Sequence, residues 1–209
     1  MLSKEKSALF IQKKWRAFIR KRKADPENVR ELASVLGRRF ESADDAFTCL
    51  HENKVIVVAN GSREKPFDGH SSFYVNNIRK HLVLLSPKVI KARNKPPYRA
   101  KYPVKYHREP GYIGTYAVIE AKDTAHLQVS DAGIKQALQY LSSKGNLFVL
   151  DDIYTNVFDS AFRQECKYFS VRPFSYGFHY NCHTFVLNVL LRIIELKRKE
   201  SVLAKYVSG

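Results

Sequence analysis

The chain has 209 residues, 44% of them hydrophobic, which is enough for one domain of ordinary size with a buried core and an appendage. Its formal net charge of +16 is large, and Cys49, Cys166 and Cys182 lack framework spacing, which argues against a disulfide scaffold and for a reducing compartment. No apolar run reaches transmembrane length, and the N-terminus is too basic for a secretory signal, so we expect a cytoplasmic protein.

The chain opens with a predicted basic amphipathic helix over residues 3–23. The first 24 residues carry nine basic side chains against one acidic, so half of the excess charge lies there. Such a helix could bind in the groove of an acidic partner, lie on an anionic membrane surface or pack on its own domain. Its apolar side chains share one broad face: Leu9, Ile11, Trp15, Phe18 and Ile19.

The spacing within this helix resembles the IQ motif. Ile11-Gln12-x-x-x-Arg16-Ala17-x-x-x-Lys21 follows the pattern Ile-Gln-x-x-x-Arg-Gly-x-x-x-Arg/Lys, with Ala17 in place of the usual glycine. The resemblance implies calmodulin or a related EF-hand protein as the partner. The residues that it implies as contacts are Ile11, Gln12, Trp15, Arg16, Phe18, Ile19 and Lys21.

A second unit is predicted from residue 25 onward, so the chain divides into a partner-binding helix (1–24) and a domain (25–209). Asp25 as N-cap and Pro26 at the first helical position predict a helix that ends near Gly37. A short helix over 42–50 and a strand over 54–59 follow, and the turn signal Asn60-Gly61 closes that strand.

Two histidines are predicted to open neighbouring strands. Residues 67–75 indicate a loop and then a strand that begins at His70. After the turn-like segment 76–80, His81 opens the apolar run 82–85. Because strands joined by a short turn have their ends side by side, His81 could orient or polarise His70, as the third member of a catalytic triad does.

The rest of the chain mixes short strands and helices. Five prolines between residues 86 and 111 predict an irregular insertion, which is the candidate for a substrate-gating or membrane-facing loop. We then expect a strand over 113–121, a helix over 130–143, a strand over 147–150, a helix over 155–167 and a strand over 168–173. This mixture, without βαβ regularity, predicts an α+β fold.

Cys182 lies where a long apolar helix begins. Residues 185–196 are apolar over most of a helical surface, and Asn181 is a good N-cap, which puts Cys182 in the first turn of a buried helix. The helix dipole and the unpaired N–H groups of that turn lower the pKa of a thiol and can hold the oxyanion of an acyl transfer. Cys182 is therefore a candidate nucleophile, with a small core residue as the alternative.

These motifs together resemble the circularly permuted papain-like fold, which includes NlpC-type hydrolases and the lecithin:retinol acyltransferase family. The matching blocks are Gly69-His70-x-x-Phe73-Tyr74-Val75, a second histidine about one hairpin later, and Asn181-Cys182-x-x-Phe185-Val186. They lie within residues 67–85 and 176–196. The chain departs from the pattern at His183-Thr184, where the family has an acidic residue followed by His, and its His-to-His spacing is about one residue short.

The resemblance implies an antiparallel sheet packed on the helix that carries the catalytic Cys. It implies a thiol hydrolase or acyltransferase that needs no cofactor and acts on an amide, ester or thioester. Cys182 would be the nucleophile, His70 the base and His81 the orienting residue. Glu120 and then Asp123 are the alternatives to His81, because relatives in bacterial effectors, including lysine fatty acyltransferases, use a carboxylate there.

Partner and location follow by the same analogy. An IQ-like helix on such an enzyme resembles host-activated bacterial effectors, which would place the protein in the eukaryotic host cytosol with a protein, peptide or lipid substrate. Whether calmodulin would activate the enzyme or only tether it is left open.

Other functions also remain open. Cys166, His179, Cys182 and His183 are ligand types that zinc selects, but there is no C-x-x-C pair, and two of the four are sequence neighbours, so we expect no metal. A non-catalytic calmodulin- or membrane-binding adaptor would need neither Cys182 nor His70. A basic nucleic-acid-binding protein would use the lysines and arginines, although no recognised nucleic-acid motif accompanies them.

Overall fold

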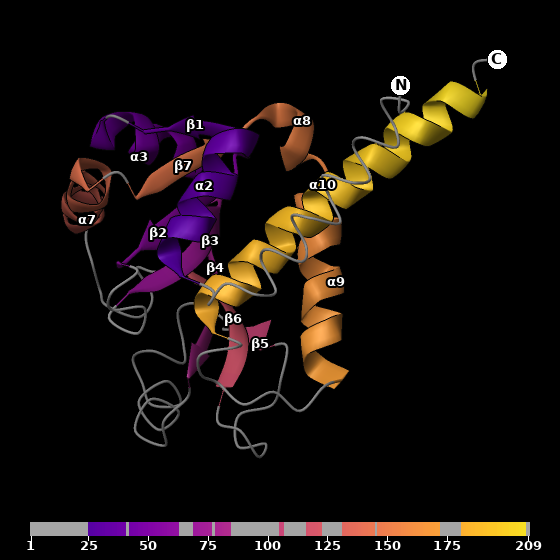
Figure 1. The fold of residues 1–209 in the computed structure, drawn as a ribbon. Coiled ribbons are helices and arrows are strands. Elements are labelled where there is room, and N and C mark those ends of the chain that lie inside the picture. The colour runs from indigo at the N-terminus through magenta and orange to yellow at the C-terminus, as the bar shows by residue number, and fades with distance from the viewer. Residues whose placement is uncertain are drawn as a thin grey trace.

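The computed structural model describes residues 25–40, 42–62, 69–76, 78–84, 105–106, 116–122, 131–144, 146–171 and 181–207. These residues form an α+β fold in which one antiparallel sheet has helices on both faces (Figure 1). The IQ-like helix, Asp123, His179 and all of the insertion except 105–106 lie outside the described residues. Among the described residues, no helix is both long and apolar enough to cross a membrane.

The sheet of the described chain has seven strands. In chain order they are β1 (Gly37–Arg39), β2 (Ile56–Asn60), β3 (His70–Val75), β4 (Ile78–Leu84), β5 (Lys105–Tyr106), β6 (Tyr116–Lys122) and β7 (Leu147–Leu150). Their spatial order is β1-β7-β2-β3-β4-β6-β5, and each neighbouring pair is antiparallel. The last strand of the chain therefore lies between the first two.

One face of the sheet is covered by α2 (Pro26–Leu36), α9 (Phe158–Val171) and α10 (Cys182–Val207), and the other by α3 (Ala43–His51) and α7 (Asp131–Ser143). Strand β2 is buried on both sides because its side chains alternate: Val57 belongs to the α10 cluster, whereas Ile56 and Val58 belong to the α3 cluster. The short helix α8 (Asp152–Thr155) connects β7 to α9.

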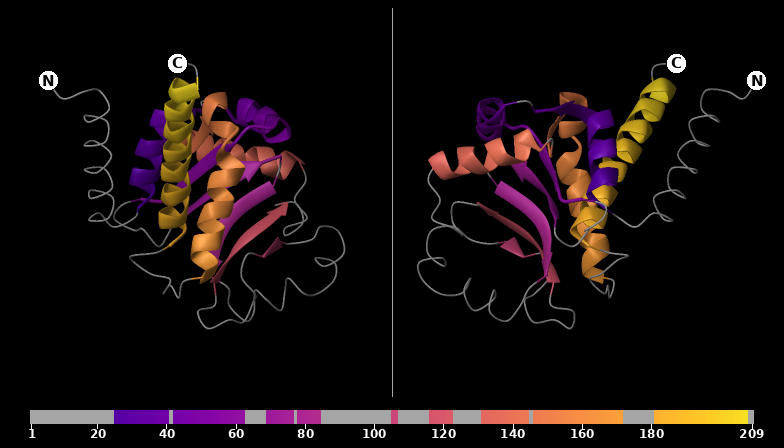
Figure 2. Two further views of the ribbon diagram at one scale, coloured as in Figure 1. Left: turned by 90° about the vertical axis from the view of Figure 1, so that its right-hand side faces the viewer. Right: turned by 60° about the vertical axis from the view of Figure 1, so that its left-hand side comes forward.

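Helix α10 is 26 residues long and begins against the sheet. It contacts β3, β4, α2 and α9, and Figure 2 shows it beside α9 on one face. Its C-terminal part, which the sequence indicated only as a basic tail after the core helix, continues the helix beyond the sheet (Figure 1). The first turn of α10, rather than its exposed end, is thus the part that meets β3.

Most predicted elements of the domain are confirmed. Asp25 caps α2 by accepting from the Asn28 N–H at 3.0 Å, and Ser42 caps α3 in the same way. The two histidine strands form the β3–β4 hairpin, whose turn residue Asn76 has a positive φ of 49°.

The strand predicted over 168–173 is wrong as far as residue 171, because α9 continues through Val171. The buried side chains Phe162, Cys166 and Phe169 recur every three to four residues, so the helical apolar face extends past the predicted end. Strand β1 was not predicted, because three residues, two of them arginine, carry too little pattern.

Candidate functional site

The first turn of α10 is held by a reciprocal cap. The Asn181 Oδ1 atom accepts hydrogen bonds from the backbone N–H groups of His183 at 2.9 Å and Thr184 at 3.1 Å. In return, Thr184 Oγ1 accepts from the Asn181 N–H at 3.2 Å. The predicted N-cap is confirmed, and Cys182 is the first helical residue, 2% exposed.

This cap changes what the helix can offer to a substrate. The amides of His183 and Thr184 are engaged by Asn181 Oδ1, and the Phe185 amide donates to the Asn181 carbonyl oxygen at 3.0 Å. The expectation that unpaired first-turn N–H groups could hold an oxyanion is therefore wrong for His183 and Thr184, whose amides the cap residue already binds.

The structure brings His70 and His81 together. The His70 Nε2 and His81 Nδ1 atoms are 2.7 Å apart, and the two rings meet edge to face with centroids 4.9 Å apart. His70 begins β3 and is partly buried, whereas His81 lies in β4 and is buried. The two rings meet as predicted, and either tautomer of each ring fits the contact. The predicted turn over 76–80 is wrong, because β4 begins at Ile78 and pairs with β3 from there, so His81 lies inside its strand and does not open it.

The glycine before His70 is required by a close approach of two backbones. A Cβ atom at Gly69 would overlap the carbonyl oxygen of Asn60 and the Cα of Gly61. Asn60 is the register partner of His70 in β2, so this approach occurs where the histidine strand begins. The Gly69-His70 pair in the sequence thus has a packing reason as well as a possible catalytic one.

Burial and neighbouring cations keep His70 neutral. Desolvation is the main cause that lowers the pKa of His70 from 6.5 to about 3, and the charges of Arg79 and His183 lower it further. At neutral pH the imidazole is therefore an unprotonated ring with one nitrogen that can accept a proton. This is the state that a general base needs.

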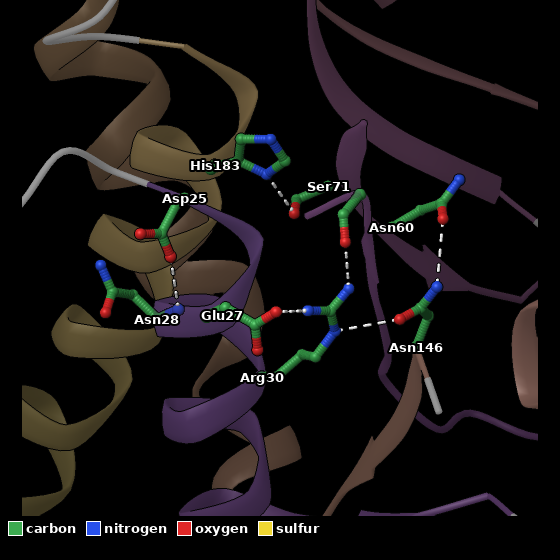
Figure 3. A network of polar contacts seen from close by, with 9 residues as sticks. Asp25, Glu27, Asn28, Arg30, Asn60, Ser71, Asn146 and His183 are labelled. Atoms are coloured by element: carbon green, nitrogen blue, oxygen red, sulfur yellow. Dashed lines mark hydrogen bonds and ion pairs between the residues drawn. The ribbon is translucent and has the colours of Figure 1, made fainter. Parts of the chain in front are cut away.

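A contact that the sequence did not predict joins α10 to β3. The Ser71 Oγ and His183 Nδ1 atoms are 2.7 Å apart, and both residues are fully buried (Figure 3). Ser71 follows His70, and His183 follows Cys182, so the contact brings the backbone of each candidate close to that of the other. His183 is the neighbour of Cys182 on the helix, and Ser71 carries no sequence signal beyond its position in the strand.

Strand alternation limits how His70 can approach Cys182. Ser71 contacts α10 and Phe73 contacts Phe158 of α9, which places their side chains on the α10 face. Ser72 instead accepts from Arg79 Nε at 3.3 Å, and in a regular strand His70 shares its side. Because His70 is the first residue of β3, contact between its ring and the thiol of Cys182 requires the ring to turn around the end of the strand.

The other predicted site residues are placed as follows. The backbone of Glu120 lies in β6 and pairs with Lys80, so β4 separates it from β3, whereas His81 lies in β4 itself. Asp123 and the IQ-like residues lie outside the described residues. Within the part of the chain that the structure describes, no group of three or more His, Cys, Asp or Glu side chains is arranged to hold a metal ion.

Comparisons with protein-family models, with curated proteins and with solved structures found no match to this chain.

Proposed function

We propose that the protein is a thiol-dependent hydrolase or acyltransferase with the permuted papain-like order, in which Cys182 is the nucleophile, His70 the base and His81 the orienting residue. The observation that supports it best is the 2.7 Å contact between His70 and His81, next to the Ser71–His183 contact at the first turn of α10. A capped helix N-terminus, a paired imidazole and a cysteine thus come from neighbouring segments.

The proposed chemistry uses the His70–His81 contact to fix a tautomer. If His70 Nε2–H donates to His81 Nδ1, the Nδ1 atom of His70 is left as a proton acceptor, and it meets the Cys182 thiol when the ring turns around the start of β3. The sulfur then bonds to the acyl carbon of an amide, ester or thioester. The bond to the leaving group breaks, and His70 returns the proton to that group.

An acceptor then loses its proton to His70 and bonds to the acyl carbon, the bond from that carbon to the Cys182 sulfur breaks, and the proton passes from His70 to the sulfur. Water gives hydrolysis, and an amine or hydroxyl gives acyl transfer. With a pKa near 3, the imidazolium of His70 is a strong acid, so it gives the proton back readily. A thiolate at Cys182 would raise this pKa, because an adjacent negative charge favours the imidazolium, so the two groups stabilise each other as the proton moves.

His81 is preferred to Glu120 as the third member. His81 is in hydrogen-bond distance of His70, whereas the Glu120 backbone belongs to β6, two strands from β3. Regulation by calmodulin or a related EF-hand protein through residues 1–24 is part of the proposal and rests on the IQ-like spacing alone. The alternatives are a non-catalytic calmodulin- or membrane-binding adaptor and a basic nucleic-acid-binding protein.

The decisive experiment measures the rate of iodoacetamide labelling at each cysteine by mass spectrometry between pH 5 and 10. Cys182, Cys49 and Cys166 are 2%, 6% and 3% exposed, so exposure cannot make Cys182 the fastest. We expect Cys182 to react fastest, and Cys49 slowly because desolvation and the nearby carboxylate of Asp45 raise its thiol pKa.

Two variants complete this test. His70→Ala should slow labelling at Cys182, and His51→Ala, which removes an exposed histidine at the end of α3, should leave it unchanged. Labelling of Cys182 with an ordinary midpoint near ~8.5, no faster than the other two cysteines and insensitive to His70→Ala, would contradict the enzyme proposal and favour the adaptor.

A further inference from the structure

The Ser71–His183 hydrogen bond connects the two segments of the site, and an inference about it rests on the proposed function. Its partners are 112 residues apart in the chain, and each directly follows a candidate catalytic residue. Both side chains are 0% exposed, so the hydrogen bond lies where water does not compete for either partner. Figure 3 shows the imidazole of His183 pointing from the start of α10 to Ser71 on the strand.

Both ends of this hydrogen bond are rigidly held. Ser71 lies inside β3, in register with Ala59 of the neighbouring strand β2. On the helix side, the backbone N–H of His183 is bound by the cap residue Asn181 at 2.9 Å. The side chain and the backbone of His183 therefore fix the first turn of α10 in two different directions.

Apolar packing alone would not fix that turn as tightly. Further along, α10 packs through fully buried apolar residues such as Phe185 and Val189. Apolar contacts are not directional, so a helix held by them can shift or rotate slightly at small cost, whereas a hydrogen bond sets distance and angle. Displacement of reacting groups by about 1 Å can lower a rate by about a hundredfold.

We propose that Ser71 and His183 form the positioning pair of the site, which fixes the first turn of α10, and with it Cys182, against the start of the strand that carries His70. Neither residue touches the reacting atoms in this proposal. The pair also gives the fully buried His183 a role that an apolar side chain at this position could not fill.

The test measures the pH profile of iodoacetamide labelling at Cys182 in the full chain. Ser71→Ala and His183→Leu should each slow labelling near neutral pH by about tenfold or more and move the profile toward that of an isolated thiol. The double variant should be no slower than either single variant, because both remove the same hydrogen bond. His183→Asn, which keeps a polar group near the Nδ1 position, should retain most of the rate.

The matched control is Ser142→Ala. Ser142 is also a buried serine, and its hydroxyl donates to the Phe40 carbonyl oxygen at 3.2 Å, on the opposite face of the sheet. Its loss should leave labelling of Cys182 unchanged, which separates positioning from general loss of a buried hydrogen bond. Circular dichroism and thermal unfolding verify the fold of each variant. If His183→Leu does not fold, the proposal is tested by comparing Cys182 labelling in Ser71→Ala with that in Ser71→Thr, which keeps a hydroxyl.

The outcomes separate this inference from the function on which it rests. Fast labelling in the unmodified chain with an unchanged profile in folded Ser71→Ala would overturn the positioning pair and leave the enzyme proposal intact. Slow labelling in the unmodified chain, no faster than at Cys49 and Cys166, would overturn both.

Discussion

At the scale of single residues, the candidate site combines groups that the sequence identifies with one that it does not. Asn181 as cap and the meeting of His70 with His81 follow from local pattern, because a helix start and a short hairpin are set by residues close in the chain. The Ser71–His183 contact joins residues 112 positions apart, and no local pattern encodes such a pairing. The same limit applies to the side of β3 from which His70 projects.

The lowered pKa of His70 predicts an acid-sensitive fold. Its ordinary pKa of 6.5 applies to the unfolded chain, and its value in the fold is about 3, so between these values the unfolded chain binds more protons. The stabilisation is complete above pH 6.5 and is lost as the pH falls toward 3. In that window His70 should lower the free energy of unfolding by about 1 kcal/mol for each unit by which the pH falls.

Urea unfolding of the unmodified chain and of His70→Gln at pH 7, 6, 5 and 4 measures this dependence. The slope of the free energy of unfolding against pH should be smaller in His70→Gln, while the exposed-residue variant His51→Gln should keep the slope of the unmodified chain. Identical slopes in all three proteins would show that His70 titrates normally in the fold and is not held neutral.

At the scale of elements, the sequence predicts correctly those helices and strands that have a clear run of apolar residues or recognisable cap and turn residues at their ends. Helix α2 and strand β7 were predicted with nearly their observed bounds. The end of α9 was not, because a run with tyrosine, phenylalanine and valine favours a strand locally, while burial of Phe169 against the core favours the helix. Tertiary packing thus decided a segment whose local preference was ambiguous.

The close approach of the β2 and β3 backbones at Gly69 can be tested by adding a methyl group there. In Gly69→Ala, the added methyl group would overlap the Asn60 carbonyl oxygen and the Cα of Gly61, so the first residue of β3 has to move away from β2. We expect a loss of stability of about 1–3 kcal/mol and slower labelling at Cys182. Thermal unfolding and the labelling assay measure the two effects.

A control variant separates the effect of a displaced backbone from the effect of a lost side chain at the same junction. Asn60→Ala keeps the backbone at this junction and removes only the side chain that accepts from Asn146 at 3.0 Å, so any change in labelling should be smaller than in Gly69→Ala. Unchanged stability and labelling in Gly69→Ala would mean that β2 and β3 do not approach as closely as the structure indicates.

At the scale of the whole molecule, the described domain begins where its first helix is capped. Asp25 is 4% exposed and holds the Asn28 amide, so a chain that starts at residue 25 retains the element that closes the α10 face. Deletion of residues 1–24 should therefore leave thermal unfolding and Cys182 labelling nearly unchanged. It should abolish the complex with calmodulin on a sizing column, with or without calcium.

Point variants show whether the motif or only its charge binds. Ile11→Asp with Trp15→Ala should abolish the calmodulin complex, whereas Lys199→Glu, on an exposed position of α10, should leave it intact. Loss of binding in Lys199→Glu and retention in the double variant would indicate non-specific attraction to an acidic protein. A complex that survives the deletion would contradict the IQ-like assignment.

The chain order of the site also has a consequence for synthesis and folding. Strand β3, which carries His70, is made early, and helix α10, which begins with Cys182, is the last element of the described core. While the chain is being synthesised, the apolar side of β3 and β4 lacks the cover of α10 until that helix is complete, and exposed apolar surface of this kind favours aggregation. Such distant contacts predict slow folding, and they also mean that no thiol can join the histidines before the core is complete.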